Sequence, residues 1–177
     1  MSERIKALIA KQRKFAEELL AEAKAYYDET GPVEVETVFG DTVATVLLPF
    51  VEPKEFEELT ERHPARPGNP TDARVWFNLH AVTRAYPGIS LRFGDETDDL
   101  RRIRGDEIAY LWPEVFDAMP PEDQENFRVA VWAMHVWEPQ KRKAAKKERE
   151  SDPAEEVDQL PVKDLVDFIV EGGNPNG

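Results

Sequence analysis

Three histidines among many carboxylates are the side chains of this sequence that could bind a metal ion. His63, His80 and His135 stand in a chain with 36 Asp and Glu residues, and imidazole and carboxylate groups are common ligands of zinc. None of the three has a second histidine or a carboxylate four positions away, the spacing of the helical His-Glu-x-x-His pair. We therefore interpret them as ordinary histidines of loops and helix surfaces, and we expect no metal site.

A second group of oxygen ligands is the acid cluster Asp95, Glu96, Asp98 and Asp99, which follows Gly94. Such a cluster could bind calcium or supply a general acid, but the spaced oxygens and terminal glutamate of an EF-hand loop are missing. Acids are also favourable at the N-terminus of a helix, where the macrodipole is positive. The cluster is thus expected to cap a helix.

Nucleophiles and phosphate loops are scarce. The serines are Ser2, Ser90 and Ser151, there is no cysteine, and no serine stands in a nucleophile elbow. Gly172-Gly173 leads into no predicted helix, so it lacks the context of a phosphate-binding loop. We expect no catalytic residue, no cofactor and no enzyme activity.

The tryptophans Trp76, Trp112, Trp132 and Trp137 could stack on bases or line a peptide groove. Their helical spacing favours a place in the core for most of them. Trp132 and Trp137 are five positions apart and should point in different directions, which leaves one of them able to reach a partner. Both are candidate partner-binding residues.

The net charge of the chain indicates which class of partner it binds. The chain has 23 Lys and Arg against 36 Asp and Glu, a formal net charge of −13, which opposes binding to nucleic acid phosphates. Residues 31–139 carry 10 bases and 21 acids, so an acidic DNA mimic remains an alternative to a protein-binding factor. The basic run from Lys141 to Arg149 could be a solvated helix face, or it could contact nucleic acid or an acidic segment of a partner.

The first element expected is an amphipathic helix over residues 2–27. Ser2 should cap it and Thr30-Gly31-Pro32 should end it. Its apolar stripe consists of Ile5, Leu8, Ile9, Phe15, Leu19, Leu20, Ala23 and Tyr26. Gln12 interrupts this stripe, which argues against a coiled coil.

The rest of the pattern predicts an α+β fold that is mainly helical. Residues 33–39 and 42–48 should form one β-hairpin around Gly40-Asp41, and residues 89–93 a short strand. About five further helices are expected, with segments starting at Pro53, at Thr71 (to Tyr86), at Asp98 (to Leu111), at Trp112 and at Pro121 (to Trp137).

The chain should divide into the helix of residues 1–30, a core of residues 31–139, and a tail of residues 140–177. In the tail, residues 140–158 should form a charged helix and a linker. A last amphipathic segment then carries the candidate partner-binding residues Leu160, Leu165, Phe168 and Ile169. We expect neither a signal peptide nor a membrane span, because charges interrupt every apolar run.

The segment from Leu48 to Lys143 carries short motifs in a characteristic order. They are Leu48-Pro49-Phe50, Phe56-Glu57-Glu58-Leu59, His63-Pro64, Ala85-Tyr86-Pro87-Gly88, Ala130-Val131-Trp132-Ala133-Met134 and Val136-Trp137-Glu138-Pro139-Gln140-Lys141-Arg142. In this order, the segment resembles the tail assembly chaperones of siphovirus-type bacteriophages, particularly those of actinobacteria. The long N-terminal helix and the basic, proline-rich stretch Arg66–Pro70 have no counterpart in the family pattern.

The resemblance implies a chaperone for virion assembly in the host cell cytoplasm. Such a protein binds the tape measure protein, keeps it soluble, helps to recruit tail tube subunits, and is absent from the mature virion. Self-association is possible, and no membrane or nucleic acid partner is implied. The chain would be the short form made without ribosomal slippage, and a programmed frameshift would produce a longer form. The alternatives are an acidic DNA mimic, another protein-binding inhibitor, or a structural tail protein of the virion.

Overall fold

The computed structural model describes residues 2–151 of the chain. The chain divides into two compact units, Met1–Gly31 and Pro32–Gly177.

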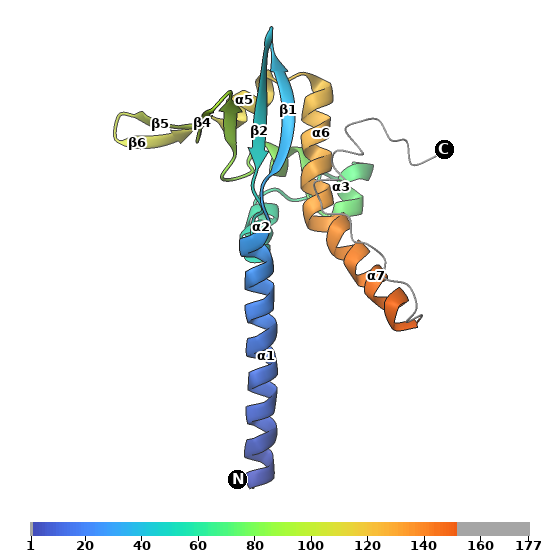
Figure 1. Cartoon of the computed structure of the whole chain (residues 1–177). Coiled ribbons are helices and arrows are strands. Elements are labelled where there is room, and N and C mark those ends of the chain that lie inside the picture. The colour runs from blue at the N-terminus through green and yellow to red at the C-terminus, as the bar shows by residue number, and fades with distance from the viewer. Residues whose placement is uncertain (1, 152–177) are drawn as a thin grey trace. The chain divides into compact units, whose positions relative to one another are not determined.

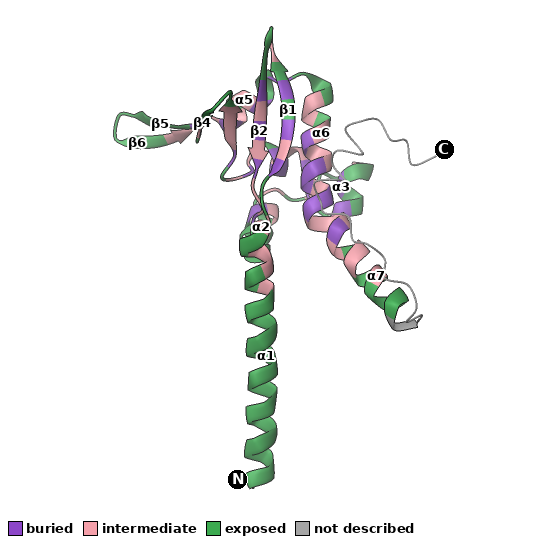
Figure 2. Ribbon diagram, in the orientation of Figure 1, coloured by how far each residue is buried: buried purple, intermediate pink, exposed green. Residues whose placement is uncertain are grey.

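The first unit is the helix α1 (Glu3–Glu29), which confirms the helix expected at the N-terminus (Figure 1). Ser2 occupies the N-cap position, but its side chain makes no capping hydrogen bond. At the other end, the Thr30 hydroxyl donates to the carbonyl oxygen of Tyr26 at 2.7 Å. None of the residues in α1 is buried (Figure 2).

The second unit contains a four-stranded antiparallel sheet. The predicted hairpin is confirmed as β1 (Val33–Phe39) and β2 (Thr42–Leu48), and the predicted third strand as β3 (Ser90–Phe93). The strand β4 (Glu96–Asp98) pairs with β3, which gives the order β1-β2-β3-β4. Alternate residues of β1 are buried, so one face of the sheet covers the core.

The helix expected over residues 98–111 is wrong, because this segment forms a second hairpin. Its strands are β5 (Arg101–Arg104) and β6 (Glu107–Tyr110). The acids before it therefore do not cap a helix. Instead, the carboxylate of Asp98 accepts from the Leu100 N–H at 2.8 Å, and that of Asp99 accepts from the Arg101 N–H at 3.0 Å, as in the turns that Asp side chains favour.

One dipeptide makes all the hairpin turns of the described sheets. Gly40-Asp41, Gly94-Asp95 and Gly105-Asp106 each lie between two directly paired strand residues. The three glycines have φ angles of 62°, 59° and 64°, a conformation that glycine adopts without steric cost. The sequence thus held a signal for the second hairpin, namely the same two residues as in the first.

Within the described residues, the second unit also contains six α-helices. They are α2 (Pro53–Glu61), α3 (Pro70–Val75), α4 (Leu79–Arg84), α5 (Trp112–Ala118), α6 (Pro121–Trp132) and α7 (Glu138–Ser151). The single helix expected from Thr71 to Tyr86 is in fact α3 and α4. Trp76 breaks it with a left-handed φ of 67°, and the Asn78 side chain then caps α4 by accepting from the Ala81 N–H at 3.1 Å.

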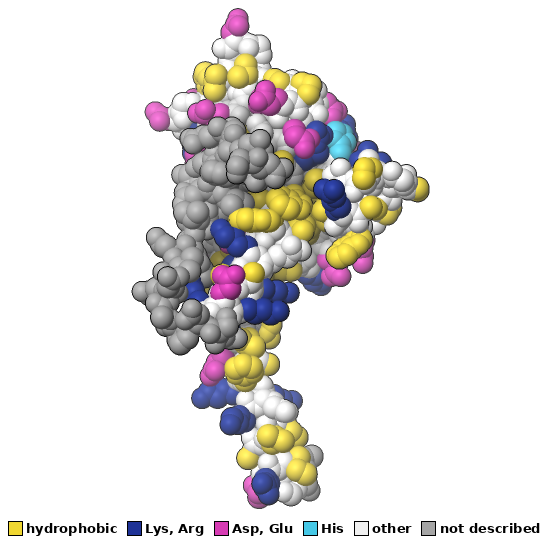
Figure 3. Space-filling view, turned by 90° about the vertical axis from the view of Figure 1, so that its right-hand side faces the viewer, with side chains coloured by type: hydrophobic (Ala, Val, Ile, Leu, Met, Phe, Trp, Pro, Cys, Tyr) yellow, Lys and Arg dark blue, Asp and Glu magenta, His cyan; other side chains and the backbone are white. Residues whose placement is uncertain are grey.

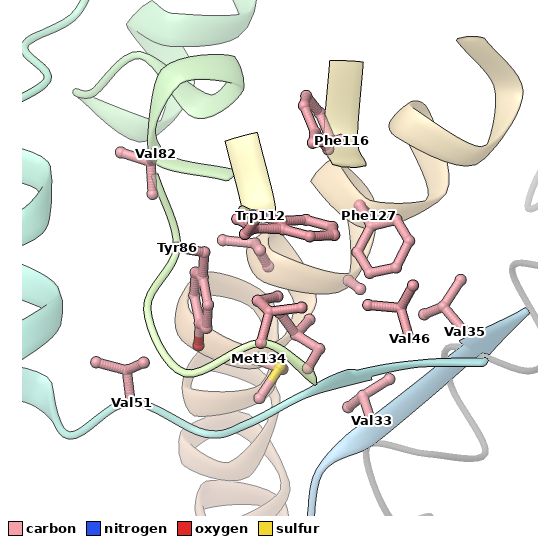
Figure 4. Packing of buried hydrophobic residues seen from close by; sticks show 14 of the residues in the cluster. Val33, Val35, Val46, Val51, Val82, Tyr86, Trp112, Phe116, Phe127 and Met134 are labelled. Carbon is pink, nitrogen blue, oxygen red and sulfur yellow. The ribbon is translucent and has the colours of Figure 1, made fainter. Parts of the chain in front are cut away.

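The core lies between the sheet and helices α4, α5 and α6. Figure 4 shows Trp112 between Tyr86 and Phe127, above the valines of β1 and β2. The indole of Trp112 is fully buried, and its N–H donates to the carbonyl oxygen of Thr83 at 2.9 Å. A core position was predicted for most tryptophans, and Trp112 occupies one, whereas Trp76 is 86% exposed.

A π-helical turn, Ala133–Trp137, joins α6 to α7 without a break. The N–H of Glu138 donates to the carbonyl oxygen of Ala133, five residues back. Pro139 explains this turn, because proline has no N–H to donate and its ring crowds the carbonyl group four residues before it. The two helices expected on either side of Pro139 are therefore one continuous helix with a widened turn.

Candidate functional site

The first candidate surface is the tryptophan pair Trp132 and Trp137. Their ring centroids are 6.5 Å apart, so the expectation that they point in different directions is wrong. Residues five apart lie about 140° apart around an α-helix, but the wider π turn brings them to one face. The Lys141 ammonium lies 4.7 Å from the centroid of the Trp137 ring, within the range of a cation–π contact.

Both tryptophans are half-buried, and Val136 beside them packs against the core. On the face of the molecule that presents α6 and α7, Figure 3 shows hydrophobic side chains gathered near the middle. Glu138 follows the pair and is 7% exposed. Its Oε2 atom is buried and accepts no hydrogen bond within the described part of the chain.

The second cluster surrounds His135, which is not the surface residue that was expected. Its ring stacks on Phe56, with centroids 3.7 Å apart and planes at 6°. Its Nε2 atom is 2.8 Å from the Tyr86 hydroxyl, which donates its only proton to the carbonyl oxygen of Pro49 at 2.9 Å. His135 must therefore donate from Nε2. Desolvation lowers the pKa of His135 to about 3, so the ring is neutral.

The third cluster is a polar cleft of about 270 Å³ beside α3 and α4. The fully buried Asp72 carboxylate accepts from the Arg66 N–H at 2.9 Å and from the Arg66 guanidinium at 2.7 Å. These hydrogen bonds lower the pKa of Asp72. They also close the basic loop Arg66–Pro70 onto α3.

His80 lines the same cleft. Arg128 Nη1 lies 2.9 Å from His80 Nδ1, and because a guanidinium can only donate, Nδ1 must be the acceptor. Burial first, and then the charge of Arg128, lower the pKa of His80. Of the three histidines, His63 lies in a loop as predicted, while the other two are enclosed by neighbouring side chains.

The fourth candidate is the β5–β6 hairpin, termed the ribbon below. Ile103 and Ile108 form a directly paired couple across its two strands and are 83% and 73% exposed. Cross-strand apolar pairs stabilise hairpins, yet so much apolar surface in one place is typical of a binding site. The ribbon extends away from the four-stranded sheet (Figure 1).

A groove of about 460 Å³ lies at the base of the ribbon. Its lining joins three parts of the chain, namely the end of α2, the turn that follows α4, and the ribbon with Asp99 shortly before it. The lining residues are Arg62, Ala85, Pro87, Gly88, Asp99, Arg101, Ile108 and Tyr110. The Tyr110 hydroxyl accepts from the Ile89 N–H at 2.6 Å, which joins β6 to the turn after α4. This groove was not predicted, since it depends on the second hairpin.

Three further expectations concern the C-terminal partner-binding residues, a metal site and a membrane span. Leu160, Leu165, Phe168 and Ile169 lie outside the described residues. Within residues 2–151, no three His, Asp or Glu side chains gather as they would around a metal ion. Among the helices of that same range, none combines the length and the apolar character needed to cross a membrane.

Taken together, the exposed apolar ribbon with its groove and the tryptophan pair are surfaces suited to binding a protein. The chain matches no family model, no curated protein and no solved structure.

Proposed function

We propose that this protein is a phage tail assembly chaperone that binds the tape measure protein, keeps it soluble and helps to recruit tail tube subunits. The observation that carries the proposal is the groove at the base of the ribbon. Ala85, Pro87 and Gly88 line it, and they belong to one of the motifs through which the chain resembles that family. The apolar pair of the ribbon adjoins the same groove through Ile108.

The expected chemistry of the tape measure protein fits this surface. A long helical protein exposes apolar stripes before it is assembled, and those stripes need to be covered. The exposed isoleucine pair beside the open groove of about 460 Å³ can accept apolar side chains from one face of such a helix, and the charged side chains that line the groove can contact its polar residues. The excess of acids in residues 31–139 keeps the complex soluble through its net charge.

The experiment is co-expression with the tape measure protein of the same phage. The wild-type chain should raise the soluble yield of the tape measure protein and co-purify with it. The variant Ile103→Thr/Ile108→Thr removes the apolar pair while it keeps β-branched residues in the ribbon. We expect this variant to lose most of the rescue and to melt at the wild-type temperature.

A matched control comes from the first hairpin. Val38 and Val43 are also a directly paired, exposed couple, and Val38→Thr/Val43→Thr makes the same kind of change away from the groove. It should retain the rescue. Unchanged tape measure solubility with the wild-type chain contradicts the proposal. Retention on DNA at physiological salt supports the acidic DNA mimic instead.

A further inference from the structure

The helix α1 has an exposed apolar face that nothing in its own unit covers. Its large apolar side chains are 41% to 71% exposed, namely Ile5, Leu8, Ile9, Phe15, Leu19 and Leu20, and Figure 3 shows hydrophobic side chains along the helix. Most of the stability of a protein helix comes from packing such a face against a neighbour. The helix has 27 residues and is about 40 Å long. We therefore expect a further protein segment to pack against its apolar face.

The distribution of charge along α1 indicates which segment packs against its apolar face. Residues 3–14 carry five bases and one acid, whereas residues 15–29 carry one base and five acids. This order opposes the macrodipole of the helix, which favours acids at the N-terminus and bases at the C-terminus. A second copy of α1 in the opposite direction relieves this arrangement, because the basic residues 3–14 then lie beside residues 20–29 of the second copy, which carry three acids and one base.

We propose that α1 pairs with α1 of a second copy of this chain as an antiparallel coiled coil. The seam positions recur with a heptad spacing, with Ile5, Gln12, Leu19 and Tyr26 in one set and Leu8, Phe15, Glu22 and Glu29 in the other. In antiparallel register, Leu19 faces Phe15 of the second copy, and Leu8 faces Tyr26 of the second copy.

Two of the three polar residues of the seam, Gln12 and Glu22, favour the same arrangement, and the third, Glu29, faces Ile5 at the end of the pair. In this register Gln12 faces Glu22 of the second copy, so an amide donor meets a carboxylate acceptor. In a parallel, in-register pair, Glu22 would face Glu22, and the two basic halves would also lie together. Gln12, which interrupts the stripe and argued against a coiled coil, thus helps to select one register.

The first test is the mass of the full-length chain, without any other protein, by sedimentation equilibrium. We expect a dimer at micromolar concentration, with twice the chain mass of 20.3 kDa. Phe15→Asp should weaken association at least about tenfold, equivalent to about 1.4 kcal/mol. Because α1 has no buried residue, this variant should leave the melting of the second unit unchanged.

Charge reversal separates a self-pair from other occupants. Lys11→Glu/Arg13→Glu/Lys14→Glu should be monomeric alone, as should Glu17→Lys/Glu18→Lys/Glu22→Lys, and an equal mixture of the two should form a heterodimer. A wild-type chain that stays monomeric overturns the proposal, and so does a mixture that does not associate. If the chain is monomeric alone and associates only with the tape measure protein, then α1 binds that protein and not a second copy of itself. This result would refute the self-pairing but not the proposed function.

Orientation is tested with spin labels, because the chain has no cysteine of its own. Ala7→Cys and Ala21→Cys both lie at exposed heptad positions of the same type. The antiparallel register separates two labels along the axis by about 30 Å at position 7 and about 12 Å at position 21, at 1.5 Å per residue. Equal distances at the two positions indicate a parallel pair and refute the antiparallel arrangement.

Discussion

The half-buried histidine of the second unit makes the stability of the folded chain depend on pH. His135 is held between Phe56 and Tyr86 and is neutral in the folded chain, where desolvation lowers its pKa to about 3. In the unfolded chain, the pKa of a histidine is about 6.5. The unfolded state therefore binds the extra proton first as the pH falls, and stability is lost below pH 6.5.

The size of this loss follows from linkage. With these two pKa values, lowering the pH from 7 to 5 removes about 2 kcal/mol of folding free energy, and the loss continues toward pH 3. The measurement is urea unfolding at the two pH values, before most carboxylates titrate. The variant His135→Phe keeps an aromatic ring against Phe56 but cannot be protonated, so it should lose about 2 kcal/mol less than the wild type between the two pH values.

A matched control is His63→Phe, which removes a loop histidine and leaves His135 in place, and it should keep the wild-type pH dependence. His80 also has a lowered pKa and contributes a loss of the same sign in every one of these proteins, so the comparison between variants cancels it. If His135→Phe and the wild type lose the same free energy between pH 7 and pH 5, the assignment of a neutral ring is refuted.

Two further changes probe other parts of the chain. Asp72→Asn removes the charged partner of Arg66. Because the Arg66 side chain is 48% exposed, we expect the free energy of unfolding, measured with urea, to fall by about 1–3 kcal/mol, less than the cost of leaving a fully buried charge unpaired. An unchanged free energy would show that the Arg66–Asp72 pair does not stabilise the loop. Deletion of residues 151–177 should leave the melting temperature nearly unchanged and weaken binding of the tape measure protein. The reason is that the apolar stripe around Leu165 is too short for a stable isolated helix. A large drop in melting temperature would show that the stripe belongs to the core.

Several elements were predictable because their signals are local. The helix α1 follows from a stripe at helical spacing that ends at Gly31-Pro32. The first hairpin follows from two β-rich runs around Gly40-Asp41. The second hairpin was missed although Gly105-Asp106 repeats that turn, since Ile103, Ile108 and Leu111 also fit an amphipathic helix. Leu111 lies three residues after Ile108 and eight after Ile103, which fits a helical face, whereas the spacing of five between the isoleucines also places them opposite each other across a two-residue turn.

The candidate site depended on contacts that no local pattern contains. The pairing of Trp132 with Trp137 requires the π turn before Pro139. The groove requires β6 to lie beside Pro87 and Gly88, some 20 residues earlier.

The sequence by itself determined the charge, the turns and the amphipathic faces, because these depend on residue type and spacing alone. Only the tertiary structure decided which faces are covered. His135 and Trp76 show this, since one is enclosed by Phe56 and Tyr86 and the other is 86% exposed. Burial is a property of the neighbours that distant segments bring, and spacing along one helix does not specify them.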